Sequence, residues 1–394
     1  MLDTAHTEAY LQGQYGQSTM PIGGTSAGGF SVQAGSVYDI DPVNRVFGEA
    51  SYSWNQSQGN RWVENADYQL LYPYLTCDTI GGGMRSEEYR FRGGYRRIKS
   101  HIIWHLALQY RALQSYRSID PRPKNKVADL SFEGSIGYAD NRYAYSFLAQ
   151  VGRYKQNNDI AFYSELGEAM VYHMVLPSAA YTRFSGGYKS AYYHGLTASG
   201  RFMLQPRTEG FLAGVGYHYF SATEELSSTT SIPIADIRTH TATALFGYAA
   251  QPWRISAQAG YALRIGTQYI YGEAANNYFN LLTRSTNYAE QHIAASLTGS
   301  YRLNLPIGYM RFAVNAAYLH KTSTSIENGG SKVSPFIPLA AYLLASQADA
   351  QASIRYAFPL KSRYSWFIQP TAAYTYYTTR SHTWQVSLST GVCF

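Results

Sequence analysis

Apolar and polar residues alternate along most of this chain, in segments of about ten residues or more. In Trp253–Ile265, the odd-numbered positions are apolar or aromatic, and the even-numbered positions are polar or small, with Arg254 and Arg264 among them. A helix would spread both sets around its surface, whereas a strand sends them to opposite faces. The alternation therefore predicts a β-strand with one face toward lipid and the other toward water.

The last segment of the chain repeats this pattern and closes on an aromatic residue. Trp384, Leu388 and Phe394 share one predicted face, and Gln385 and Ser387 share the other. A terminal aromatic residue that closes an alternating strand resembles the C-terminal signature by which bacterial outer-membrane barrels are recognised for assembly. Phe394 is therefore the expected assembly signal.

Strand patterning extends over nearly the whole chain and predicts an all-β, transmembrane, antiparallel, up-and-down β-barrel. Bacterial barrels made of a single chain use even strand numbers, so we expect about sixteen strands, or fourteen if the N-terminal segment lies outside the wall. Residues 1–28 would then form either a first strand or a partial plug, and residues 29–394 the barrel. Besides the two segments above, the expected strands are Tyr10–Tyr15, Phe30–Tyr38, Arg45–Trp54, Glu88–Arg97, His101–Leu113, Leu130–Tyr138, Tyr143–Val151, Tyr192–Leu204, Phe211–Phe220, Thr239–Ala250, His292–Leu303, Gly308–His320, Gln351–Phe358 and Tyr364–Tyr376.

The predicted connections alternate between short and long. This is the asymmetry of outer-membrane barrels, with short periplasmic turns and long extracellular loops, and it places both termini in the periplasm. Cys77 then falls in an outer loop, reachable from outside the cell, and Cys393 at the periplasmic end, too far away for a disulfide. The long connections are Gln56–Gly83, Arg117–Lys126, Asn157–Tyr188, Glu224–Ala235, Thr267–Tyr288 and Lys321–Gln347.

Composition agrees with a wall that meets lipid. Charged residues make up only 14% of the chain and aromatic residues 15%, with 38 tyrosines. The longest apolar run, Phe336–Ala345, is interrupted by Pro338 and is half the length that a membrane-spanning helix needs. The first twelve residues lack the basic and apolar segments of a secretory signal, so we expect a mature or trimmed form.

Arginines recur on the faces that we assign to the barrel interior. A charge on the lipid face near the midplane costs about 2–4 kcal/mol, which favours the inward direction for these side chains. With a net charge of +7, they predict a basic lumen that handles an anionic solute. The alternative is that they pair with Glu49, Glu88 and Glu133 inside a packed barrel. The candidates are Arg90, Arg92, Arg96, Arg111, Arg201, Arg254, Arg264, Arg302 and Arg355.

We find no catalytic or cofactor-binding motif. His101 and His105 would share the face of a helix, but on a strand they lie roughly 13 Å apart and cannot hold one metal ion. The expectation is a protein that is not an enzyme, with no metal and no cofactor. Basic residues follow barrel faces, so we expect no nucleic-acid partner; the surrounding partner is outer-membrane lipid.

Two short motifs carry a resemblance to a known family. The stretch 59–65, GNRWVEN, and the stretch 120–123, DPRP, resemble an uncharacterised family of Bacteroidota outer-membrane β-barrel proteins. The order of a strand that ends in Gln109–Arg111, the DPRP loop and the Leu130–Tyr138 strand is similar too. The resemblance implies an association with TonB-dependent uptake systems.

Two hypotheses of function follow. In the first, the barrel is an accessory component or pore of a nutrient uptake system, with a basic lumen. In the second, it is a plugged barrel that displays loops to a partner, either a TonB-dependent transporter or a surface lipoprotein. Conductance of the purified protein separates them.

Overall fold

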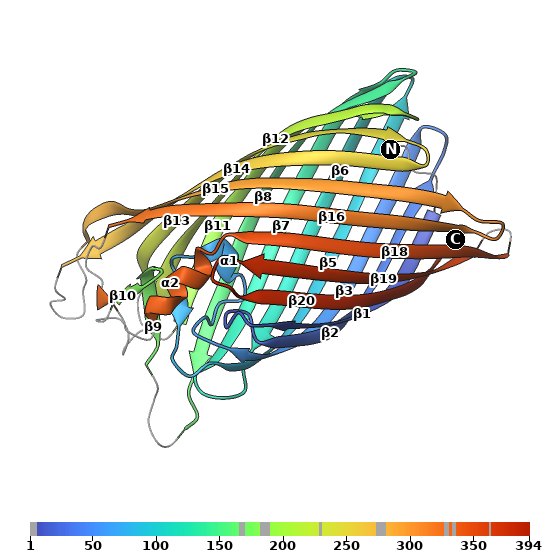
Figure 1. Cartoon of the computed structure of the whole chain (residues 1–394). Coiled ribbons are helices and arrows are strands. Elements are labelled where there is room, and N and C mark those ends of the chain that lie inside the picture. The colour runs from blue at the N-terminus through green and yellow to red at the C-terminus, as the bar shows by residue number, and fades with distance from the viewer. Residues whose placement is uncertain are drawn as a thin grey trace.

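A computed structural model describes residues 6–164, 170–181, 190–227, 231–272, 281–326, 331–332, 336–361 and 364–394. Sixteen antiparallel strands form one closed barrel, drawn in Figure 1. The predicted architecture is therefore confirmed, and with it the strand number of sixteen. No helix in these ranges is long and apolar enough to cross a membrane.

The wall strands follow one another around the barrel in chain order. Their bounds are β1 His6–Ser18, β2 Ser26–Asp39, β3 Asn44–Asn60, β5 Gly82–Lys99, β6 Ile102–Tyr116, β7 Arg122–Ala139, β8 Tyr143–Ala161, β11 Ser190–Pro206, β12 Gly210–Ser227, β13 Ser231–Ala250, β14 Trp253–Tyr271, β15 Leu281–Asn304, β16 Tyr309–Ser325, β18 Gln347–Lys361, β19 Tyr364–Tyr377 and β20 His382–Cys393.

The N-terminal segment supplies the strand that closes the barrel. β1 pairs with β20 from Glu8 opposite Cys393 to Ser18 opposite Thr383. On its other side, β1 pairs with β2 over twelve positions. The start of β1 and the end of β20 thus lie at the same end of the barrel, which we call the short-turn end (Figure 1).

The outer face carries the belt that the alternation predicts. On β20, Val386 and Leu388 are 47% and 54% exposed, whereas the inward Ser389 is buried. On β14, the outward Trp253 and Tyr261 lie eight residues apart with aliphatic side chains between them. Eight residues of strand cover roughly 27 Å, or about 21 Å after the usual tilt, which is close to the height of a lipid-facing band.

Most strands reach further from the short-turn end than the sequence indicates. β15 begins at Leu281 rather than at His292, and β8 ends at Ala161 rather than at Val151. The connection predicted over Glu224–Ala235 is largely strand, because β12 continues to Ser227 and β13 starts at Ser231. Beyond the lipid belt the outer face no longer has to be apolar, so the two-residue period fades while the strand continues.

The connections at the opposite end, which we call the loop end, differ from the expectation in two places. The predicted loop Arg117–Lys126 shrinks to residues 117–121, since β7 starts at Arg122. The first connection, residues 19–25, also belongs to this end. Parts of the predicted connections Asn157–Tyr188, Glu224–Ala235, Thr267–Tyr288 and Lys321–Gln347, with Ser362 of the last short turn, lie outside the described residues.

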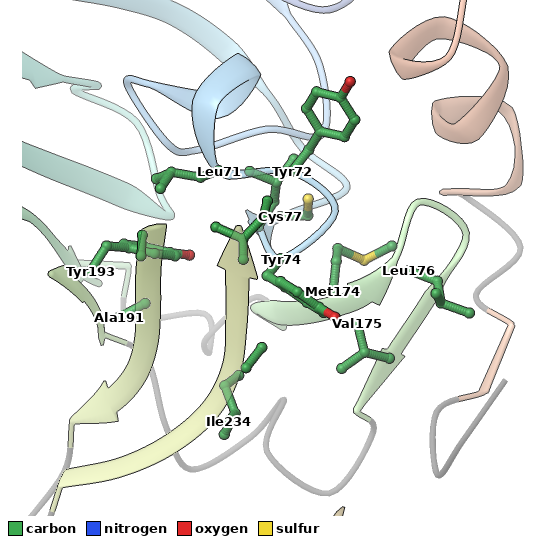
Figure 2. Packing of buried hydrophobic residues seen from close by; sticks show 14 of the residues in the cluster. Leu71, Tyr72, Tyr74, Cys77, Met174, Val175, Leu176, Ala191, Tyr193 and Ile234 are labelled. Carbon is green, nitrogen blue, oxygen red and sulfur yellow. The ribbon is translucent and has the colours of Figure 1, made fainter. Parts of the chain in front are cut away.

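Three long connections fold back into the loop-end mouth and pack there together. They contribute the helices α1 (Tyr68–Leu71) and α2 (Ile337–Leu343) and a small sheet, in the order β17 (Ser331–Lys332), β10 (Ala179–Tyr181), β9 (Tyr172–Leu176), β4 (Thr76–Cys77). We call the described residues 61–81, 170–181, 331–332 and 336–346 the plug. Its shared core is continuous with inward side chains of the wall, such as Tyr193 and Ile234 (Figure 2).

Candidate functional site in the lumen

Each of the nine arginines named from the sequence lies on the inward register of its strand. Exposed outward neighbours mark the alternation: Phe91 is 51% exposed beside Arg90 and Arg92, Phe202 is 44% exposed beside Arg201, and Ile255 is 48% exposed beside Arg254. The structure divides them by what they contact. Arg90, Arg92, Arg111, Arg264 and Arg355 contact carboxylates or the plug.

A first group pairs with carboxylates of the wall. Arg92 donates to Glu133 at 3.0 Å and lies 3.8 Å from Glu49. Its guanidinium also covers the ring of Phe47 at 5.1 Å. His105 approaches the same Glu133 at 3.4 Å. Arg92 therefore matches the alternative stated above, a charge pair within the barrel rather than a free guanidinium.

Arg111 fastens the plug to the wall. Its two terminal nitrogens donate to the two carboxylate oxygens of Asp67, each at 2.8 Å, and its Nε donates to Glu88 at 2.6 Å. Asp67 directly precedes α1, so this fork holds the first long connection on β6. Arg90 shares Glu88, at 2.5 Å, but is half exposed and makes no hydrogen bond or ion pair with the described residues of the plug.

A second anchor lies on β14 and β15. The guanidinium of Arg264 lies 4.1 Å from the ring centre of Tyr72 and donates to the backbone oxygen of Gln69 at 3.0 Å. The Tyr72 hydroxyl donates to Glu290 at 2.6 Å, and the Tyr74 hydroxyl donates to Asn287 at 2.6 Å. Tertiary contacts alone bring these groups together, because each joins a loop to a strand about two hundred residues away in sequence.

A third charged cluster joins the first plug connection, residues 61–81, to the loop that follows β6. Arg117 donates to Asp78 at 2.5 Å and lies 3.4 Å from Glu64, and all three side chains are almost fully buried. Burial, followed by the charge of Asp78, raises the pKa of Glu64 well above its usual value, and Arg117 offsets only part of this. The cluster thus places two carboxyl groups and one guanidinium group together in a buried site.

The remaining candidates lie toward the short-turn end. Arg355 donates to Glu8 at 3.0 Å and covers the Phe367 ring at 3.7 Å. Arg302 donates to Asn304 at 3.2 Å. Arg254 is exposed and inward, and Arg96 and Arg201 have the same inward register.

Two cavities lie inside the barrel beside the plug. The cavity nearer the loop end, which we call the upper cavity, has a volume of about 610 Å³. The cavity nearer the short-turn end, which we call the lower cavity, has a volume of about 530 Å³. Both are lined by the wall strands β18, β19, β20, β1, β2 and β3, and on the first four of these the two linings are two to four residues apart. For example, Gln14 lines the upper cavity and Gln12 the lower, and Gln385 lines the upper cavity and Ser387 the lower. The two cavities are therefore stacked along one side of the lumen.

The plug occupies the other side. Its core includes the inward residues Tyr154 of β8, Tyr193 of β11, Phe220 of β12 and Ile237 of β13, all at most 2% exposed. The stacked cavities are lined instead mainly by amides, hydroxyls and tyrosines. The lumen is thus divided into an apolar side filled by the plug and a polar side that is hollow.

The cysteines and histidines lie in separate surroundings in the structure. Both cysteines are free thiols, as expected. Cys77, however, is 0% exposed because it lies in the plug core, so the expectation that it is accessible from outside is wrong. His101 approaches the backbone oxygen of Ala139, and His105 stacks on Phe47. Among the described residues, no three His, Cys, Asp or Glu side chains gather as a metal site would require.

Sequence reasoning missed several residues that shape the lumen, namely Asp67, Tyr72, Glu290, Lys321 and Arg311. The first three make their contacts between a loop and a distant strand, which no local pattern signals. Lys321 donates to the backbone oxygen of Leu343 in α2. Arg311 lies within a predicted strand, between the outward Met310 and Phe312, so the alternation itself assigns it to the interior.

A closed barrel of sixteen strands with an apolar outer belt and a plugged, partly hollow lumen defines an outer-membrane-type β-barrel. The chain belongs to a family of unknown function, DUF6850, whose model matches residues 2–309. No curated protein matches the chain.

Solved structures similar to this chain are themselves barrels of low sequence identity. A FadL homologue of Pseudomonas aeruginosa is 11% identical, with a TM-score of 0.44, over 99% of this chain and 89% of its own. The toluene transporter TbuX of Ralstonia pickettii is 11% identical, with a TM-score of 0.40, over 100% and 90%. The alcaligin receptor FauA of Bordetella pertussis is 8% identical, with a TM-score of 0.40, over 97% and 75%.

Proposed function

We propose that this protein is a channel through which small polar solutes cross the outer membrane, as the pore or an accessory component of an uptake system. The observation that carries the proposal is the pair of cavities stacked along β18, β19, β20 and β1, beside a plug that fills only the opposite side. Barrels of sixteen strands are wide enough for an aqueous channel. The short turns would then face the periplasm, together with both termini.

The lining of this side suits hydrophilic solutes. Gln14, Gln385 and Thr375 line the upper cavity, and Gln12 and Gln369 line the lower. Amides and hydroxyls both donate and accept hydrogen bonds, so they replace part of the hydration shell of a polar solute without binding one charge tightly. The fixed plug narrows the lumen and sets the size of what passes.

A pair of neighbouring substitutions on β19 tests the path. Ala373 is inward and lies opposite Gln351 of the lower cavity and Gln385 of the upper. Ala372, one residue away, lies on the lipid-facing side. We expect wild-type protein in planar bilayers to conduct, Ala373→Trp to lose most of the conductance and Ala372→Trp to keep it. Equal conductance of the two variants would rule out this path.

A second candidate function is protein docking at the loop end. Several apolar side chains are exposed there, beyond the lipid belt, including Tyr163 at 69%, Leu282 at 67% and Ile326 at 63%. Apolar side chains exposed beyond the lipid belt are candidates for contact with another protein. The partner would be a TonB-dependent transporter or a surface lipoprotein, with the barrel as an anchor. Wild-type protein that folds correctly but carries no current would favour this function over the channel.

A further inference from the structure

Three inward arginines stand directly opposite one another on adjacent strands near the short-turn end. Arg302 of β15 is the register partner of Arg311 of β16, and Arg311 is in turn the register partner of Arg355 of β18. The pairing of β15 with β16 and of β16 with β18 contains no β-bulge, so all three side chains point to the same side of the wall. We call Arg302, Arg311 and Arg355 the arginine row.

The inward direction of the row follows from its neighbours. Tyr301, Phe312 and Ile354 each precede or follow a row arginine and are 45%, 36% and 40% exposed on the lipid-facing side. Ten positions beyond Arg311 on the same strand, Lys321 points inward to the plug. The arginine row therefore points into the lumen and away from the lipid.

The row is short of counter-charges. Among the described residues, the one carboxylate that contacts it is Glu8, 3.0 Å from Arg355. Within the described part of the chain, the side-chain partners of Arg302 are the neutral groups of Asn304 and Tyr309. Arg311 makes no side-chain hydrogen bond or ion pair within the described ranges. Next to the row, Arg254 of β14 adds a further inward cation, opposite Ser300.

Such an arrangement is unfavourable for the empty barrel. Like charges directly opposite each other destabilise a sheet, and here two successive opposite pairs are arginines. Register partners have Cα atoms about 5 Å apart, so the three guanidinium groups start within roughly 10 Å along the wall. An anion with several oxygens can accept from two or three such planar forks at once, which a monatomic ion cannot.

We propose that the arginine row is a binding site for a small oxyanion, a phosphate- or carboxylate-bearing solute of at least two negative charges, at the short-turn mouth of the lumen. The site names a class of solute for the channel proposed above, and its role in transport rests on that function. Binding of the anion does not depend on the channel function, and it is measured separately.

The experiment uses the full chain folded in nonionic detergent, with inorganic phosphate as the probe at constant ionic strength. Isothermal titration and the thermal unfolding midpoint report binding. We expect phosphate to bind and to raise the midpoint of the wild type, and Arg311→Gln to weaken binding about tenfold, the effect of losing one charge-assisted contact. Arg142→Gln is the control, since it removes the same charge from an exposed turn at the same end.

A second readout separates a ligand site from a structural one. In low salt without phosphate, Arg311→Gln is expected to raise the unfolding midpoint above that of the wild type, because it removes like-charge repulsion. A lower midpoint in that condition would make Arg311 structural and overturn the proposal. So would phosphate binding that is equal in Arg311→Gln and wild type.

Two further experiments distinguish a soluble anion from a lipid headgroup and separate failure of the channel from failure of the binding site. Phosphatidylglycerol in mixed micelles should not displace phosphate, because the row faces away from lipid; displacement would overturn the solute assignment in favour of a headgroup. If Ala373→Trp leaves conductance unchanged while Arg311→Gln still loses phosphate, the channel path fails and the oxyanion site stands. If Ala373→Trp blocks conductance and phosphate does not bind, the site fails and the channel stands.

Discussion

Releasing the plug from β6 should be measurable through the plug's own cysteine. Arg111→Gln removes both bonds to Asp67 and the bond to Glu88; Glu88 keeps Arg90, whereas Asp67 loses the cation with which it pairs. Removing one partner of a buried ion pair costs about 3–5 kcal/mol. The side chains of Arg111 and Asp67 are 17% and 14% exposed, so we take the lower end, about 3 kcal/mol, as the loss of plug stability.

Cys77 reports this loss because its thiol is fully buried in the plug core. A destabilisation of about 3 kcal/mol raises the population of the open plug roughly a hundredfold, and labelling by an impermeant maleimide should accelerate by that factor when opening is fast. The measurement is made in a Cys393→Ser background. Arg90→Gln is the matched control, because it also removes a partner of Glu88, while Arg90 forms no hydrogen bond or ion pair with the described residues of the plug. Equal labelling rates for Arg111→Gln and wild type would refute the reasoning.

Three further predictions address the wall, its assembly and the buried acid. Leu388→Asp should impair refolding into bilayers by about 2 kcal/mol, while the inward Ser387→Asp is tolerated; the opposite ranking in a lipid-refolding assay would reverse the face assignment. Removal of Phe394 should lower outer-membrane levels in cells, and unchanged levels would show that the terminal aromatic is no assembly signal. Glu64→Gln should flatten the pH dependence of plug stability: the raised pKa of Glu64 stabilises the plug below the ordinary value of 4.5, and that stability is lost as pH rises through the raised pKa. At neutral pH the variant should label more slowly at Cys77 than wild type, after normalisation to a cysteine peptide, and faster labelling would contradict the raised pKa of Glu64.

The wall could be predicted from the sequence because each strand carries its own signal. Trp253–Ile265 and Thr383–Phe394 read as strands without any partner, since lipid on one side and water on the other impose the alternation locally. The same signal fails where lipid ends, which is why the start of β15 at Leu281 was not predicted.

A plugged barrel was one of the two hypotheses, but the residues that form and hold the plug could not be predicted, because their contacts are long-range. Asp67 and Arg111 are 44 residues apart, and Tyr72 and Glu290 are 218 apart. A loop that packs inward and a loop that extends into solvent have the same polar and aromatic composition. For the same reason, the expectation that Cys77 is accessible from outside was wrong. Arg311 differs, because the alternation of its strand was sufficient to place it.

The central claim is that solutes pass along β18, β19, β20 and β1, beside the plug. It is tested most directly by single cysteines on β1, in a background without Cys77 and Cys393, modified by a bulky water-soluble thiol reagent during single-channel recording. Modification at Gln12→Cys or Gln14→Cys should cut the current, since both side chains line the cavities, whereas modification at the outward Gly13→Cys should leave it unchanged. A current that is insensitive at positions 12 and 14, in a channel that conducts, would contradict this account.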